Sequence, residues 1–113
     1  MYSIYAREVV CWRRTNVLEK SIEKFLRDGV RRLGGVAYKF TSPGNVGVPD
    51  RLVLWPDGRA VFVELKAEGG KLSRMQEIQI NRIRKLGHHV AVVRGIEEAK
   101  IFLATWGGKR NEI

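Results

Sequence analysis

The sequence predicts an α/β fold in which helices flank a mixed β-sheet, in the core order α-β-β-β-α-β. Three segments carry apolar residues at helical spacing. Four shorter segments are rich in valine, phenylalanine or tyrosine and lie near glycines and prolines. A hairpin signal separates the second strand from the third, whereas a helix-length segment separates the third from the fourth. Hairpins join antiparallel strands and helical crossovers join parallel ones, so we expect both kinds of pairing in one sheet.

The first helix is expected to begin at Asn16, which can cap it, with Glu19 at the capping-box position. Glu19 also lies on the apolar stripe of this helix, while Glu23 lies at the flank of the stripe. The stripe comprises Ile22, Leu26, Val30 and Leu33, and it is widened by Phe25. Two successive glycines at positions 34 and 35 end the helix.

Strands are expected at residues 36–41, 50–55, 59–66 and 89–94. The turn Pro56-Asp57-Gly58 joins the second and third as a hairpin. Ser73 caps a second helix that runs to about residue 86, and its apolar residues are Met75, Ile78, Ile80, Ile83 and Leu86. A last helix covers about residues 96–106.

Composition limits the classes of protein that fit. The 113 residues suit one domain over 1–113, with a core at about 17–94, an N-terminal arm and a C-terminal helix. Lysine and arginine number 21 against 12 acids, and this net charge of +9 favours a nucleic-acid partner. The single cysteine excludes a disulfide framework, and no apolar run reaches the ~20 residues of a membrane span. We therefore expect a cytoplasmic protein that binds neither a membrane nor a small-molecule cofactor.

The third strand ends in Glu64-Leu65-Lys66, which places an acid and a base on one face of the strand. Asp50 and Glu64 each lie seven positions from residue 57, so the hairpin brings these carboxylates together. Converging carboxylates repel unless a divalent cation lies between them, and oxygen ligands suit Mg²⁺ or Mn²⁺. A neighbouring lysine can orient or help deprotonate an attacking water. The alternative is a local ion pair at the end of a solvated strand.

These residues resemble a known motif. Pro49-Asp50 followed by Glu64-Leu65-Lys66 resembles the PD-(D/E)xK motif of restriction-endonuclease-like nucleases. The wider context resembles the VRR-NUC family, the virus-type replication–repair nucleases, over about residues 17–94. The matching segments are Glu19-Lys-Ser-Ile-Glu23, Gly47-Val-Pro-Asp50-Arg-Leu, Phe62-Val-Glu-Leu-Lys66 and Leu72-Ser-Arg-Met-Gln76. The chain resembles the stand-alone viral and bacterial members of that family.

The resemblance implies a metal site whose ligands are Asp50, Glu64, the Leu65 carbonyl and, through a water, Glu19. It also implies that Lys66 positions or activates the attacking water and that Gln76 supports the site. Three alternatives remain open at the level of sequence. Glu23 could replace Glu19 as the helix carboxylate, Glu19 could serve only in a capping box, and Gln76 could serve only to bond the backbone where its helix starts.

The implied activity is that of a metal-dependent, structure-selective DNA endonuclease that cuts four-way (Holliday) junctions, as a homodimer, in DNA repair. Basic residues are expected to contact phosphates, and the candidates are Lys39, Arg51, Lys71, Arg74, Arg82, Arg84 and Lys85. The dimer interface is expected in segments 1–14 and 96–106, with the exposed aromatics Tyr2, Tyr5, Trp12 and Trp106. The alternatives are a nonspecific or flap nuclease, an inactive nucleic-acid-binding module, and a small basic structural protein.

Overall fold

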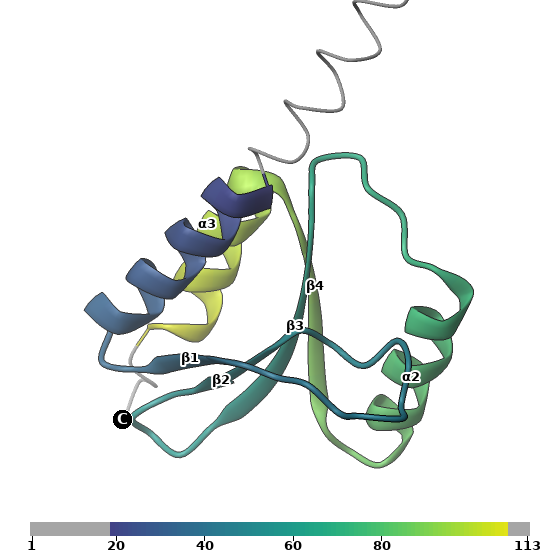
Figure 1. The fold of residues 1–113 in the computed structure, drawn as a ribbon. Helices are drawn as coiled ribbons and strands as arrows, with labels where there is room; N and C mark the ends of the chain where they lie inside the picture. Colours follow the sequence, from purple (N-terminus) through teal and green to yellow (C-terminus); the bar gives the residue numbers. More distant parts are fainter. Residues whose placement is uncertain (1–18, 109–113) are drawn as a thin grey trace, which may run out of the picture.

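The computed structural model describes residues 19–108, which form three helices and a four-stranded sheet (Figure 1). A helix over residues 19–32, here called the N-terminal helix, precedes the remaining elements. These are β1 (Val36–Lys39), β2 (Arg51–Leu54), β3 (Ala60–Lys66), α2 (Arg74–Lys85), β4 (His89–Arg94) and α3 (Gly95–Trp106). The order confirms the predicted one. The expected Asn16 cap and the N-terminal arm lie outside the described residues. No helix within 19–108 is long and apolar enough to cross a membrane.

The sheet is mixed, as predicted, with the strand order β1-β2-β3-β4. β2 pairs antiparallel with both β1 and β3, whereas β3 and β4 run parallel on either side of the α2 crossover. In the hairpin, Arg51 lies opposite Val63 and Leu52 lies opposite Phe62. One further step of this register places Asp50 opposite Glu64, which is the juxtaposition expected from their equal distances to the turn.

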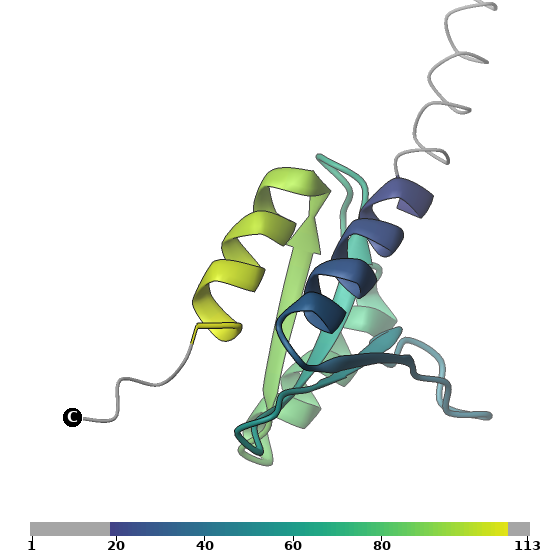
Figure 2. The same cartoon turned by 90° about the vertical axis from the view of Figure 1, so that its left-hand side faces the viewer.

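Helices cover both faces of the sheet. The N-terminal helix and α3 lie side by side on one face, and α2 lies on the other (Figures 1 and 2). The main core lies beneath the helix pair and includes Ile22, Leu26, Val30, Val53, Val61, Val63, Leu65, Ala99, Phe102 and Leu103. Because side chains alternate along a strand, the odd-numbered residues of β3 enter this core. Phe62, Glu64 and Lys66 therefore face the α2 side.

The two sides of the sheet are packed unequally. On the α2 side a single helix covers the strands, and only Gln79 and Ile80 of α2 are buried. Met75, Ile78 and Leu86 remain exposed, although their spacing is that of an apolar helix face. Periodicity identified the helix correctly, but it did not show that so little of its apolar surface would be covered.

The C-terminal helix differs from expectation. Segment 96–106 was expected to contribute to a dimer interface, but Ala99, Phe102 and Leu103 of α3 are residues of the chain's own core. Trp106 is not a free aromatic either. Its ring packs against Phe102 and His89, and the Arg59 guanidinium lies 5.3 Å from the ring centroid. Tyr2, Tyr5 and Trp12, the other aromatics expected at an interface, lie outside the described residues.

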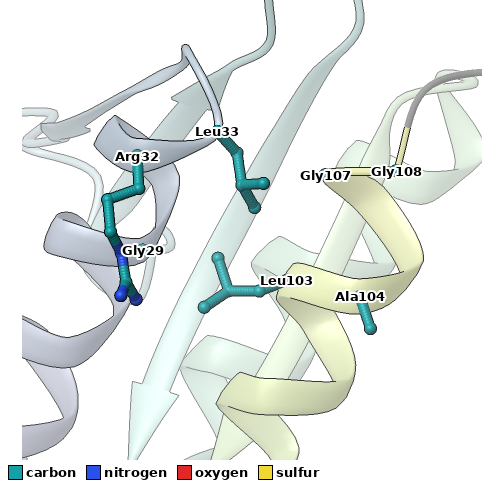
Figure 3. A pocket seen from close by; sticks show the side chains of 7 residues that line it. All are labelled: Gly29, Arg32, Leu33, Leu103, Ala104, Gly107 and Gly108. Carbon is teal, nitrogen blue, oxygen red and sulfur yellow. The ribbon is translucent and has the colours of Figure 1, made fainter.

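An apolar hollow opens between the ends of the two helices on this face (Figure 3). Its volume is about 490 Å³. The residues that line it are Gly29, Arg32, Leu33, Leu103, Ala104, Gly107 and Gly108. This lining contains no carboxylate, and it lies across the sheet from Glu64. The hollow is therefore separate from the predicted catalytic residues.

Candidate active site

Asp50 immediately precedes β2, and its side chain is tied to the neighbouring strand. Its Oδ1 accepts a hydrogen bond from the Leu65 backbone N–H at 3.2 Å. The last β2–β3 pair is Arg51 with Val63, so this bond lies just beyond the ladder. The N–H and C=O of one strand residue point to the same neighbour, and the Leu65 carbonyl therefore projects toward the Asp50 edge. This geometry agrees with the carbonyl's predicted place near the metal.

Glu64 is buried, with 4% of its surface exposed. Its Oε1 accepts a hydrogen bond from Gln76 Nε2 at 3.4 Å, while its Oε2 has no hydrogen-bond partner among the described residues. Burial, together with the charge of Asp50, raises the pKa of Glu64 to about 7, although the charge of Lys66 acts in the opposite direction. Burial also raises the pKa of Asp50. Within residues 19–108 no ion pair joins Glu64 to Lys66, so the strand-end ion pair is not what the structure contains.

Gln76 makes two kinds of contact. It bonds the backbone at the start of α2, and it also bonds Glu64, so both contacts considered from the sequence are present. Its backbone N–H donates to Ser73 Oγ, and its own Oε1 accepts from the Ser73 N–H at 2.8 Å, which completes a capping box. The box fixes the orientation of the amide, so Nε2 points away from the cap toward Glu64 Oε1. The Ser-x-x-Gln spacing thus both starts the helix and supplies a hydrogen-bond donor to the buried Glu64.

The loop before Asp50 is fixed against α2 through Gly47. This glycine has a φ of +93°, and a Cβ there would lie 2.6 Å from the carbonyl carbon and oxygen of Met75. Only glycine tolerates both the left-handed backbone and this close approach. Pro49 is fully buried two residues later. The Gly-Val-Pro-Asp segment therefore sets the position of Asp50 relative to the start of α2, where Gln76 lies.

Glu19 and Glu23 have different surroundings. Glu23 forms an ion pair with the Arg51 guanidinium, and Arg51 is only 7% exposed. Arg51 was expected to contact phosphates, and this is wrong. Its side chain alternates to the face opposite Asp50 and is used by the N-terminal helix. Glu19 is exposed, and its negative charge adds to the effect of burial in raising the pKa of both Asp50 and Glu64.

The expected basic residues also separate into two groups. Arg84 donates to the Val90 carbonyl at 2.8 Å and so braces α2 against β4. By contrast, Lys39, Lys71, Arg74, Arg82 and Lys85 are exposed, and none forms an ion pair with another residue in 19–108. The exposed group is available to a phosphate backbone.

The donor set fits a hard divalent cation. Asp50 and Glu64 supply carboxylates, the Leu65 carbonyl projects to the same edge, and one buried oxygen of Glu64 has no hydrogen-bond partner in residues 19–108. Mg²⁺ is commonly bound by one or two carboxylates with the remaining positions filled by water and substrate phosphate. In the described part of the chain, no group of three or more His, Cys, Asp or Glu side chains is placed to hold a metal ion. Glu19 therefore does not join Asp50 and Glu64 as a third direct ligand in this structure, and its role through a water stays a prediction.

Comparison with known proteins agrees with this geometry. The family model described as the VRR-NUC domain matches residues 3–97. A phage relative, "Putative nuclease p44" of Acyrthosiphon pisum secondary endosymbiont phage 1, is 52% identical over 77 residues, which are 68% of this chain and 83% of the relative. A solved structure titled VRR-NUC domain aligns with a TM-score of 0.73 and 31% identity, over 78% of this chain and 96% of its own. A second, titled VRR-NUC domain protein, has a TM-score of 0.59 at 18% identity, over 78% of this chain and 86% of its own, and shares the fold. The chain therefore belongs to the VRR-NUC family of nuclease domains.

Proposed function

We propose that this chain is a cytoplasmic Mg²⁺- or Mn²⁺-dependent endonuclease that hydrolyses phosphodiester bonds in branched DNA, four-way junctions in particular. The observation that carries the proposal is the buried Glu64 carboxylate, whose Oε2 has no partner among the described residues. An unpaired buried charge is costly, and a bound cation would remove that cost. The net charge of +9 and the exposed lysines and arginines along α2 supply the attraction for DNA.

The side chains divide the work of hydrolysis. Asp50, Glu64 and the Leu65 carbonyl would hold a divalent cation, which supplies Lewis-acid stabilisation of charge on the phosphate. Lys66 shares a strand face with Glu64, so its ammonium can donate hydrogen bonds to the attacking water or to a phosphate oxygen. The water oxygen bonds to phosphorus and releases a proton to solvent, while the bond to the leaving sugar oxygen breaks and that oxygen takes up a proton from solvent. Gln76 Nε2 keeps the Glu64 carboxylate oriented throughout.

A homodimer would supply the two cuts that a four-way junction requires. Each chain carries one set of the proposed catalytic residues, and closed pairs of identical subunits are the commonest oligomers. The apolar hollow in Figure 3 and the exposed Ile101 of α3 provide a surface for a second copy, across the sheet from Glu64. Light scattering is expected to give twice the 12.9 kDa chain mass.

The test is cleavage of a panel of four-way junction, flap, single-stranded and linear duplex DNA with Mg²⁺ or Mn²⁺. Asp50→Asn and Glu64→Gln should lose cleavage of every substrate but retain junction binding, because each change removes a cation ligand and leaves the phosphate contacts. Glu77→Gln, an exposed acid in the first turn of α2, is the matched control and should cut normally. Normal turnover by both site variants would overturn the assignment.

A further inference from the structure

The loop between β1 and β2 presents an apolar tip beside the candidate active site. Val46, at this tip, has 72% of its surface exposed, the largest exposed fraction recorded for a large apolar residue within 19–108. Single exposed apolar residues are common on protein surfaces and need no explanation. Here, however, the loop is held in place and the neighbouring helix adds two more exposed apolar side chains.

Several contacts fix the loop. Its outer turn is closed by the Asn45 N–H and side-chain amide, which donate to the Ser42 carbonyl and Oγ at 3.0 and 2.8 Å. Gln79 is buried, and its Nε2 donates to the Val46 carbonyl at 3.4 Å. Gly47 packs on the Met75 backbone, so the tip lies against the first turns of α2 (Figure 1). Val46 is thus an exposed side chain on an anchored backbone.

The apolar surface continues onto α2. Met75 and Ile78 are 43% and 38% exposed, and residues three apart lie on the same side of a helix. We call Val46, Met75 and Ile78 the apolar ridge. The ridge lies close to the site along the chain, because Met75 precedes Gln76, which bonds Glu64, and Val46 lies on the loop that leads to Asp50.

Exposed cations flank the ridge on both sides. Lys71 and Arg74 precede it, while Arg82 and Lys85 follow it within two helical turns. No described acid pairs with any of these four side chains. An apolar strip between unpaired cations matches a polyanion that also exposes apolar faces. DNA has this character where base stacking is interrupted, since the phosphates continue while the base faces become accessible.

We infer that the apolar ridge contacts unstacked bases at a DNA branch point and thereby directs the nuclease to branched substrates. This inference rests on the proposed function. Apolar side chains of other proteins insert between base steps, and unstacking an intact step costs free energy. At a branch the bases are only partly stacked, so this cost is smaller, and a ridge next to the scissile phosphate holds a branch base out of the stack and favours junctions over linear duplex. Structure selectivity then comes from the loop that carries Asp50 rather than from reading of the base sequence.

The experiment compares Val46→Ser with Leu86→Ser, a matched control that is 71% exposed at the far end of α2. Both proteins would be given a four-way junction and a linear duplex of the same arm sequence, with Mn²⁺. The Val46→Ser variant should lose about fivefold or more of its junction-to-duplex cleavage ratio, with its rate on duplex unchanged. The Leu86→Ser ratio should equal that of the wild type. Equal melting temperatures would confirm that both variants fold.

The outcomes separate the inference from the proposed function. A wild-type protein that cuts no DNA would overturn the proposed function. A wild type that cuts both substrates equally, or a Val46→Ser ratio equal to the Leu86→Ser ratio, would overturn the ridge alone. A second readout uses 2-aminopurine at the branch base. Asp50→Asn should raise its fluorescence on binding, and the Asp50→Asn, Val46→Ser double variant should not. A rise of the same size in both would also overturn the ridge.

Discussion

An acid and a base lie close together on each face of the β2–β3 hairpin, but only one of these two pairs forms an ion pair. On the helix-pair face, the buried Arg51 guanidinium of β2 is paired with Glu23 from the N-terminal helix. On the α2 face, Glu64 of β3 is buried near Lys66 but forms no ion pair with it, and its Oε2 has no partner within 19–108. Arg51 lies opposite Val63, the residue that precedes Glu64 in β3, so the two pairs are next to each other on the hairpin.

The comparison shows how two buried charged residues, Arg51 and Glu64, can have different surroundings. Burial lowers the pKa of Arg51 and raises the pKa of Glu64, so both charges are disfavoured by the same desolvation. Arg51 has its counter-charge built into the chain, whereas Glu64 keeps one oxygen open. A satisfied buried pair indicates a structural contact, and an unsatisfied buried carboxylate beside a second carboxylate indicates a site for a ligand.

The largest expected effect concerns Lys66. Lys66→Met keeps the aliphatic stem and removes the amine, so the single-turnover cleavage rate should fall by about 10²–10⁴-fold, the usual loss for a positioned proton-transfer group. Mn²⁺ affinity measured by calorimetry should change little, because Lys66 is not among the proposed ligands. A rate change below about threefold would return Lys66 to a purely structural role.

A smaller effect is expected when the hydrogen-bond donor beside Glu64 is replaced by an acceptor. Gln76→Glu keeps the acceptor needed for the capping box but replaces the Nε2 donor beside Glu64 with a carboxylate oxygen. Cleavage should fall by about 10–100-fold, the usual cost of losing a residue that orients a metal ligand, with the melting temperature retained. Ser73→Ala is the control and should show the reverse, since it costs about 1 kcal/mol of stability and leaves the amide donor in place. Equal cleavage by both variants would contradict the dual role of Gln76.

Breaking the Glu23–Arg51 ion pair should lower the stability of the protein and leave its cleavage activity unchanged. Glu23→Gln leaves the Arg51 guanidinium buried without its counter-charge, and the free energy of unfolding should fall by about 2 kcal/mol. The value lies below that of a fully buried pair because the Glu23 side chain is 41% exposed. Urea unfolding measures the loss, and Asp28→Asn, which breaks an exposed pair with Lys24 on the same helix, should cost less than about 0.5 kcal/mol. If Glu23→Gln abolished cleavage while remaining folded, Glu23 and not Glu19 would be the helix carboxylate of the site.

A pH dependence of stability belongs to the open acid, Glu64. The folded-state pKa of Glu64 is about 7, above the ordinary 4.5, so between these values the folded protein holds a proton that the unfolded chain releases. The metal-free protein should therefore lose stability as pH rises from about 5 to 8. Melting temperatures measured in EDTA should fall over this range, and Glu64→Gln should flatten the fall. Mn²⁺ at pH 8 should restore the wild type and leave the variant unchanged. A wild-type slope equal to that of Glu64→Gln would show that Glu64 ionises normally.

Local patterns predicted the fold and the juxtaposition of Asp50 with Glu64. Alternation along the strands and the Pro56-Asp57-Gly58 turn were sufficient, because hairpin register depends on nearby residues. The same alternation places Arg51 on the face opposite Asp50, but its partner Glu23 lies 28 residues earlier, and no local pattern identifies that contact. The contacts of Trp106 with Arg59, 47 residues earlier, were missed for the same reason.

The dual use of Gln76 shows another limit. Ser73 was predicted to cap the helix, and Gln76 to bond the backbone at its start, and the structure shows both contacts. The Nε2 atom of the same amide also donates to Glu64, however, and that contact depends on how α2 packs across β3. That packing also decides how much of the α2 apolar face is covered, which is why Met75 and Leu86 are exposed despite helical spacing. Sequence periodicity identifies the face of a helix and not the area of its contact.

The packing of Gly47 on α2 also determines where this loop can change in length. The outer turn at residues 42–45 closes on itself through Asn45 and Ser42, so insertions or a fluorescent label there leave the remaining backbone in place. Toward Asp50 the chain has no such freedom, since one added methyl group at Gly47 would collide with the Met75 backbone and displace the acid that follows. Loop-length variation and engineered tags therefore belong in the outer turn, a few residues from the chemistry.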